Sequence, residues 1–385
     1  MKKQITILIL LFFNCIFAWS QDSFVKTDLP CDKDLILKTP GRWLKVDENA
    51  YGVAKVTSQQ RQELMNRLNK IHQWIYDIYP SPTAVDARPL HFTMDKYFAS
   101  QLKVERLQND RIRETDVNGI PVIFYRYATM FCGYHCGRTT YEIRRSPGCE
   151  APTTISITIN NLDDIFIQLW LDDNTEIMRV EERPIKMLSP IVGKWKGYDV
   201  YNSNGIDNAK QDRVLLFHRE GMLPYIPVTR KQYLDRYFEC LQIFFDKMIK
   251  SSEHPEGLAL LMDKKEREEQ TNKIKKQKDD VMKYYQDELE ATTKAGLLDA
   301  PAIMFGDIMP LLTQYPIFMT KEKGGSMLVT ENPAYIRKDL PKYIPQFIIY
   351  QLSNGPVYYI DQSLNPYKLI DDNFPIEKLQ AMIDK

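Results

Sequence analysis

Two stretches of the chain repeat apolar residues at the spacing of an amphipathic helix. In the first, Thr57 and Gln60 form a capping box, and Pro80 and Pro82 end the pattern. Its apolar stripe consists of Leu64, Leu68, Ile71, Ile75 and Ile78. The second repeats the capping box at Thr229 and Gln232, with a face made of Tyr233, Tyr237, Cys240, Leu241, Phe244 and Met248. We therefore predict helices over residues 57–78 and 229–250, and a further helix over residues 95–107.

Other segments are typical of β-strands. β-Branched and aromatic residues dominate residues 121–128, 153–160, 165–170 and 213–218. Within residues 154–159, Thr or Ser alternates with Ile, which predicts a sheet with one wet face. Two further strands flank Asn354-Gly355, a favoured hairpin turn, and a short helix is expected after Pro375. The pattern predicts an α+β fold with largely antiparallel sheets and flanking helices.

A long charged segment follows the second helix. Residues 263–280 contain 13 charged residues, seven basic and six acidic, and the apolar stripe through Ile274, Val281, Tyr285 and Leu289 is narrow. We predict a long, solvated helix that forms a helical hairpin of the coiled-coil type with the 229–250 helix. A disordered segment is the alternative.

These elements suggest how the chain is organised. We predict an N-terminal α+β domain over residues 21–220 and a C-terminal region over residues 221–385 that holds the helical hairpin and a β-hairpin. A single domain with the helical hairpin as an insertion is the alternative.

The first twenty residues resemble the leaders of proteins exported by Gram-negative bacteria. Lys2 and Lys3 precede an apolar run over residues 5–17, and Ala18-Trp19-Ser20 offers small residues at a cleavage site. We predict a signal peptide over residues 1–20 and a product in the periplasm, outside the cell or at its surface. No later apolar run has the roughly 20 residues that a membrane helix needs, so no membrane span is expected.

The charge balance argues against two classes of partner. The chain has 51 basic and 51 acidic residues. Proteins that bind nucleic acids or anionic membranes usually carry a basic surplus, so neither partner is expected.

Five cysteines remain after removal of the leader: Cys31, Cys132, Cys136, Cys149 and Cys240. In an oxidising compartment we predict disulfide bonds. Cys240 lies on an apolar helix face and is expected to stay unoxidised and buried. Of the other four, we favour Cys149 with either Cys132 or Cys136, and Cys31 with the remaining one.

The cysteine segment allows a different chemistry. Cys132, His135 and Cys136 are all possible metal ligands, but their spacing lacks the two separated pairs of a usual zinc site. A thiol-redox or metal module is therefore only an alternative hypothesis, and we expect no cofactor.

Candidate catalytic residues are few. His218 ends a predicted strand beside Arg219, with Arg230 further along, and strand ends often carry sites. The adjacent carboxylates Asp172/Asp173 and Glu181/Glu182 are typical of turns rather than of a glycosidase pair. No nucleophile elbow, Walker loop, zinc-protease motif or dinucleotide fingerprint occurs in the chain.

Together these features favour an exported binding or structural protein of the cell envelope over an enzyme. Its partner would be a protein or a glycan, and the charged helix would offer a surface for it. A secreted hydrolase, with dispersed carboxylates or a site centred on His218, is the rival hypothesis.

Overall fold

The structure is a computed structural model that describes most of the chain after residue 23. It describes residues 24–26, 30–46, 54–106, 112–136, 141–145, 152–168, 178–181, 183–202, 212–254, 263–304, 317–355 and 365–385. Several predicted features lie outside these residues. They are the signal peptide, Cys149, the second strand of the C-terminal β-hairpin, and at least one member of each carboxylate pair.

The helices agree with the two capping boxes. Helix α3 begins after Thr57 and α4 after Thr229. In each, the Thr hydroxyl accepts from the backbone amide of the Gln three residues on, and that Gln side chain accepts from the Thr backbone amide. The helices are α2 (Lys33–Lys38), α3 (Ser58–Ile78), α4 (Arg230–Glu253), α5 (Lys264–Lys294), α6 (Tyr367–Asn373) and α7 (Ile376–Gln380), with 3-10 turns η1 (Asp163–Ile165) and η3 (Lys321–Lys323).

The strands form one large sheet and three smaller ones. They are β1 (Phe24–Lys26), β2 (Arg42–Trp43), β3 (Val85–Phe98), β4 (Gln101–Arg106), β5 (Ile112–Val117), β6 (Ile120–Cys136), β7 (Glu142–Arg145), β8 (Thr153–Ile159), β9 (Phe166–Gln168), β10 (Arg179–Val180), β11 (Arg183–Pro184), β12 (Lys186–Leu188), β13 (Ile191–Trp195), β14 (Tyr198–Tyr201), β15 (Asp212–Phe217), β16 (Tyr225–Pro227), β17 (Ile303–Met304), β18 (Ser326–Glu331) and β19 (Ile348–Ser353).

The large sheet has ten strands, and all of its pairs except β2 with β3 are antiparallel. Its main order is β1-β7-β6-β8-β19-β15-β14-β13, with β3 on β6. Strand β19, from near the C-terminus, therefore lies between β8 and β15. Strands from both sides of residue 221 share this sheet, as in the single-domain alternative; the division into folding units stays a prediction.

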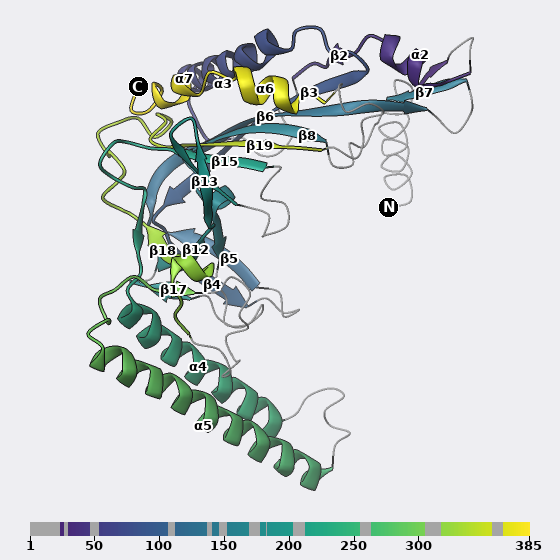
Figure 1. Cartoon of the computed structure of the whole chain (residues 1–385). Helices are drawn as coiled ribbons and strands as arrows, with labels where there is room; N and C mark the ends of the chain where they lie inside the picture. The colour runs from purple at the N-terminus through teal and green to yellow at the C-terminus, as the bar shows by residue number, and fades with distance from the viewer. Residues whose placement is uncertain are drawn as a thin grey trace, which may run out of the picture.

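The alternation in β8 is present, but the polar face that it predicts to be wet is buried as well, since Ser156 and Thr158 are 6% and 0% exposed. Ile155, Ile157 and Ile159 are completely buried in the core that includes α3 and α7, which cover the sheet in Figure 1. The residues between them face the other side, where Thr158 contacts Arg126 and Asp164. The antiparallel sheets and flanking helices confirm the α+β fold.

Strands β3 and β6 of the large sheet continue as a two-stranded ribbon, β4 and β5, which extends below that sheet in Figure 1. Strands β3 and β6 pair as far as Phe98 and Ile120, and β4 and β5 resume pairing at Gln101 and Val117. Between these points both chains bend together, and Ala99 and Asn118 have positive φ angles of 49° and 56°. The ribbon thus changes direction without losing its register.

The ribbon shows that one prediction was wrong. Residues 95–106 of the predicted 95–107 helix are not helical, since residues 95–98 pair with residues 120–123 and residues 101–106 form β4. The apolar spacing suggested a helix, but pairing with a distant segment fixed an extended conformation.

The lower part of the molecule is a helical hairpin (Figure 1). Tyr237 and Tyr285 stack at 4.5 Å between α4 and α5, and Lys278 and Lys275 form ion pairs with Asp246 and Glu253. The prediction of a helix over the charged segment is confirmed, because α5 is helical over 31 residues. Its use as a partner surface stays a prediction.

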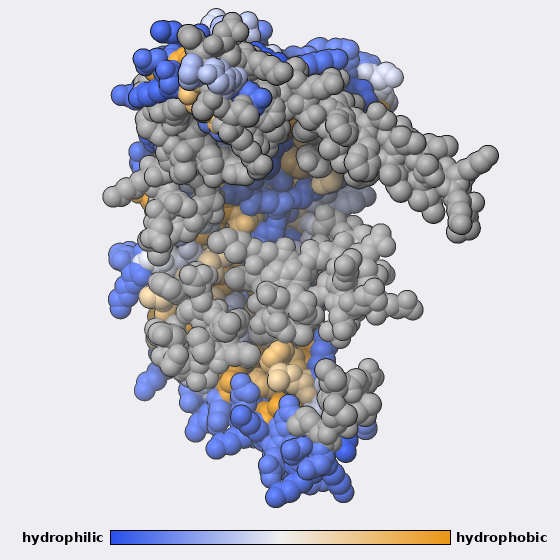
Figure 2. Space-filling view, turned by 90° about the vertical axis from the view of Figure 1, so that its right-hand side faces the viewer, coloured by the Kyte–Doolittle hydropathy of each residue, from blue (hydrophilic) through white to orange (hydrophobic). Residues whose placement is uncertain are grey.

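The surface differs between the ends and the middle of the molecule. On the face drawn in Figure 2, hydrophilic side chains lie on the hairpin and on the upper layer, and a hydrophobic patch lies just above the hairpin. Among the described residues, no helix is both long enough and apolar enough to cross a membrane.

Candidate functional site

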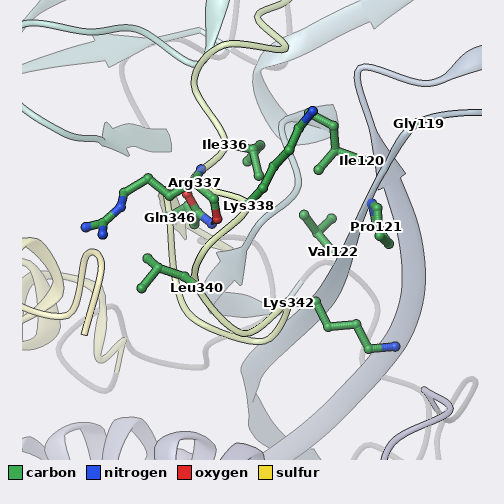
Figure 3. Close-up of a pocket in the computed structure, with 10 residues that line it drawn as sticks. All are labelled: Gly119, Ile120, Pro121, Val122, Ile336, Arg337, Lys338, Leu340, Lys342 and Gln346. Atoms are coloured by element: carbon green, nitrogen blue, oxygen red, sulfur yellow. Dashed lines mark hydrogen bonds between the residues drawn. The ribbon is translucent and has the colours of Figure 1, made fainter.

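A pocket lies where the ribbon bends, beneath a loop that comes from near the C-terminus (Figure 3). Its volume is about 320 Å³, at the small end of the range for ligand sites. The residues that line it are Gly119, Ile120, Pro121, Val122, Ile336, Arg337, Lys338, Leu340, Lys342 and Gln346. It is thus formed by the first residues of β6 and by residues 336–346.

The pocket combines an apolar wall with a basic rim. Ile120, Val122, Ile336 and Leu340 supply the apolar surface, and the rim carries three cations. In Figure 3 the Arg337 and Lys342 side chains point outward on opposite sides, whereas that of Lys338 extends toward Ile120. A ligand in this pocket would meet hydrocarbon on its body and positive charge at its edge.

Two buried amides fasten the loop over the pocket. The Asn160 side chain donates to the carbonyl oxygens of Ile344 and Ile123, at 2.9 and 3.3 Å, and accepts from the Gln346 amide at 2.8 Å. Asn160 can make all three bonds because its φ is +58°, which turns the chain at the end of β8.

Gln346 continues this connection. Its side chain accepts from the Arg337 backbone amide at 2.8 Å and donates to the Arg337 carbonyl at 3.0 Å. Asn160 and Gln346 are buried, so these bonds are shielded from water. The wall of the pocket is therefore fixed before any ligand enters.

The outward cations of the rim already have acidic partners. Arg337 donates to both carboxylate oxygens of Asp339, at 2.6 and 3.3 Å, and Lys342 donates to Asp95 at 3.0 Å. Burial alone would raise the pKa of Asp95. The hydrogen bonds from the Lys55 amide and from Lys342 outweigh burial and lower that pKa. Asp95 therefore stays ionised and holds Lys342 in place.

Gly119 lets the ribbon bend tightly at the pocket. A Cβ atom on Gly119 would lie 2.5 Å from the Tyr97 Cβ and 3.0 Å from the Phe98 carbonyl oxygen. No side chain larger than hydrogen fits there without a shift of the opposite strand.

The predicted catalytic candidates lie in separate surroundings. His218 Nδ1 is 2.8 and 3.0 Å from the Arg219 and Met222 carbonyl oxygens, so this nitrogen carries the proton and donates. Arg219 forms a bidentate pair with Asp384 at 2.8 and 3.0 Å, and Arg230 lies over the Phe318 ring. The His218 ring thus bonds to the Arg219 backbone, but among the described residues no hydrogen bond or ion pair joins the side chains of two of these three candidates.

Arg219 instead supports the pocket from outside. Its guanidinium also reaches the Tyr335 carbonyl at 3.1 Å and Gln346 Oε1 at 3.4 Å, so it links the C-terminal Asp384 to the pocket wall. This arrangement gives Arg219 an anchoring role.

The cysteines are largely oxidised. Cys31 and Cys136 are joined by a disulfide bond, one of the two arrangements that the sequence left open. Cys132 is also disulfide-bonded. Cys240 keeps a thiol and is completely buried on α4.

The oxidised cysteines bear on the metal hypothesis. Metal binding by Cys132, His135 and Cys136 would need thiolates, and the sulfur of a disulfide is not one. No group of three or more His, Cys, Asp or Glu side chains within the described ranges has a geometry suited to a metal ion.

Comparison of the chain with family models, with curated proteins and with solved structures finds no match in any of the three.

The sequence did not indicate the pocket. Its two halves lie more than 200 positions apart, and apolar periodicity carries no information on such pairing. Two local signals existed: the Asn118-Gly119 dipeptide marks a sharp change in chain direction, and Arg337-Lys338 lies between the loop prolines Pro333 and Pro341.

Proposed function

We propose that this chain is an exported binding protein without catalytic activity, and that its ligand is a small molecule held in the pocket between β6 and residues 336–346. One observation carries the proposal: a loop fixed by Asn160 and Gln346 encloses an apolar surface with a charged rim. A rigid, largely apolar concavity with few polar groups is the usual form of a ligand site.

Two further observations support the proposal. The Cys31–Cys136 disulfide is compatible with an oxidising compartment. Arg219, one of the candidates for hydrolysis, is occupied by a bidentate pair with Asp384. A base and an acid that face a common substrate would leave such groups available.

The test is to fill the pocket. Leu340→Trp places a large side chain in the lining, while Leu369→Trp changes an exposed leucine on α6, outside the pocket. A library of small organic fragments is screened against residues 21–385 by ligand-observed NMR. We expect a set of fragments to bind the wild type and the Leu369→Trp variant and to lose binding to Leu340→Trp.

Two results would contradict the proposal. One is that fragments bind all three proteins equally, or bind none of them. The other is turnover of glycan, peptide or ester substrates by the purified wild type.

A further inference from the structure

We infer that the ligand of this pocket is an organic anion with a single negative charge and a short apolar body. This inference rests on the proposed function and adds the chemical class of the ligand. It depends on a difference among the three cations of the rim. Arg337 and Lys342 are already paired with carboxylates, whereas Lys338 is not paired with any described carboxylate.

Arg337 is neutralised within the loop. Asp339 takes two of its hydrogen bonds, and Asp384 lies 4.0 Å from its Nη1. Asp384 is itself bound by Arg219. These four residues carry two positive and two negative charges, so this side of the rim has no net charge to offer a ligand.

Lys342 is neutralised on the opposite side. Its ammonium donates to Asp95 at 3.0 Å and reaches the Lys55 carbonyl at 3.4 Å. Asp95 also accepts from the Lys55 backbone amide at 2.7 Å. A ligand carboxylate would have to displace a partner that several bonds hold in place.

Lys338 is the exception. It forms no ion pair and no hydrogen bond with any part of the chain that the structure describes. Its side chain is exposed and extends in the direction of Ile120 (Figure 3). The rim therefore has one uncompensated positive charge, close to hydrocarbon.

The surroundings define the rest of the ligand. Ile120, Val122, Ile336 and Leu340 offer contact to a short alkyl or aromatic group, and a pocket of about 320 Å³ limits its size. A second negative charge on the ligand would meet this apolar wall or the paired cations, and its loss of water would not be repaid. A neutral ligand would leave Lys338 without a partner.

The experiment compares three probes of similar length: hexanoate, its neutral amide hexanamide, and the dianion adipate. Binding to residues 21–385 is measured by ligand-observed NMR titration at low ionic strength. We expect hexanoate to bind at least threefold more tightly than hexanamide and adipate. An exposed ion pair contributes an effect of this size.

Variants assign the effect to one side chain. Lys338→Gln should weaken hexanoate binding by about three- to tenfold and leave hexanamide unchanged, while Lys338→Arg should keep the preference. Lys321→Gln, at an exposed lysine in η3 outside the pocket lining, is the matched control and should change neither affinity.

The outcomes separate this inference from the proposed function. If hexanamide or adipate binds as well as hexanoate, or if Lys338→Gln has no effect, the inference is wrong and the pocket remains a ligand site. If hexanoate fails to bind while other fragments bind and are blocked by Leu340→Trp, the inference is again wrong. If no fragment depends on Leu340, both proposals fail.

Discussion

Two buried polar side chains at the large sheet, Asn160 and His91, differ in how they are hydrogen-bonded. Asn160, at the end of β8, uses both its amide nitrogen and its oxygen to hold the loop over the pocket. His91, in β3, is 2% exposed, yet within the described part of the chain neither of its ring nitrogens has a hydrogen-bond partner. The first arrangement fixes the wall of the pocket, and the second buries two ring nitrogens for which the described residues supply no partner.

The surroundings of His91 explain why burying its ring lowers the stability of the fold. Its ring packs on Tyr127, whose hydroxyl is 2.9 Å from His72 Nδ1 and 2.5 Å from Thr129 Oγ1, so that hydroxyl is already occupied. Burial, and secondly the charge of His72 when protonated, lower the pKa of His91 from 6.5 to about 4. The comparison shows that burial stabilises a polar group only when its partners are buried with it.

The largest effect is expected at Asn160. Asn160→Leu leaves two buried carbonyls and the Gln346 amide without their partner, and it places a branched side chain at a positive φ. We expect a loss of about 3–5 kcal/mol in the free energy of unfolding, measured by urea denaturation.

Two variants refine this first prediction. Asn160→Gly tolerates the positive φ, so the loss that it retains belongs to the hydrogen bonds. Asn373→Ala removes an exposed Asn whose side chain donates to the Leu369 carbonyl, and it should cost less than about 0.5 kcal/mol. Equal losses at Asn160 and Asn373 would contradict the role given to Asn160.

The second prediction concerns pH. The folded protein holds His91 neutral down to about pH 4, whereas the unfolded chain binds that proton below about 6.5. The unfolded state therefore carries more protons between these values, so stability is full above pH 6.5 and falls as the pH drops toward 4. The difference amounts to about 3 kcal/mol.

His91→Phe tests this pH dependence. Phe keeps a ring beside Tyr127 and has no nitrogen to bury, so unfolding midpoints at pH 7.5 and pH 4.5 should lie closer together than in the wild type. His254→Gln, at an exposed helix end, is the control and should keep the wild-type difference. A wild-type difference that persists in His91→Phe would assign the pH effect to other groups.

The third prediction concerns the bend of the ribbon. Gly119→Ala brings a Cβ to within 2.5 Å of Tyr97 and should cost about 1–3 kcal/mol in thermal or urea unfolding. Gly193→Ala, in β13, meets no atom within 4 Å and should be close to neutral. If the two variants behave alike, the close approach at Gly119 carries no energetic weight.

The smallest effect is expected at the C-terminal anchor. Arg219→Lys keeps the charge but loses the bidentate pair with Asp384, and the site is partly exposed, so we expect a loss of about 1 kcal/mol. Hydrogen exchange should show faster exchange in α7 without a change in α3. Unchanged exchange in α7 would remove the anchoring role.

Elements held by contacts between residues close in sequence could be predicted, whereas elements held by contacts between distant segments could not. The capping boxes at Thr57 and Thr229 and the apolar stripes behind them are local, and both helices were predicted. The strand over residues 95–98 was missed because its partner, residues 120–123, lies beyond any local pattern.

The candidate site was less predictable for the same reason. Lys338 and Ile120 are brought together by the whole sheet, and Asn160 looks in the sequence like an ordinary turn residue. The sequence drew attention to His218 and Arg219 because of residue type. Only the fold shows that His218 Nδ1 bonds to backbone carbonyls and that Arg219 pairs with Asp384.

Strand β19 constrains the order of events while the chain is being made. Its neighbours β8 and β15 are complete by Phe217, but Ile348 emerges roughly 130 residues later, which takes on the order of 10 s at usual ribosome speeds. During that interval the edges of both strands are open to incorrect pairing. A chaperone that holds the nascent polypeptide extended until its last forty residues arrive would protect it during this interval.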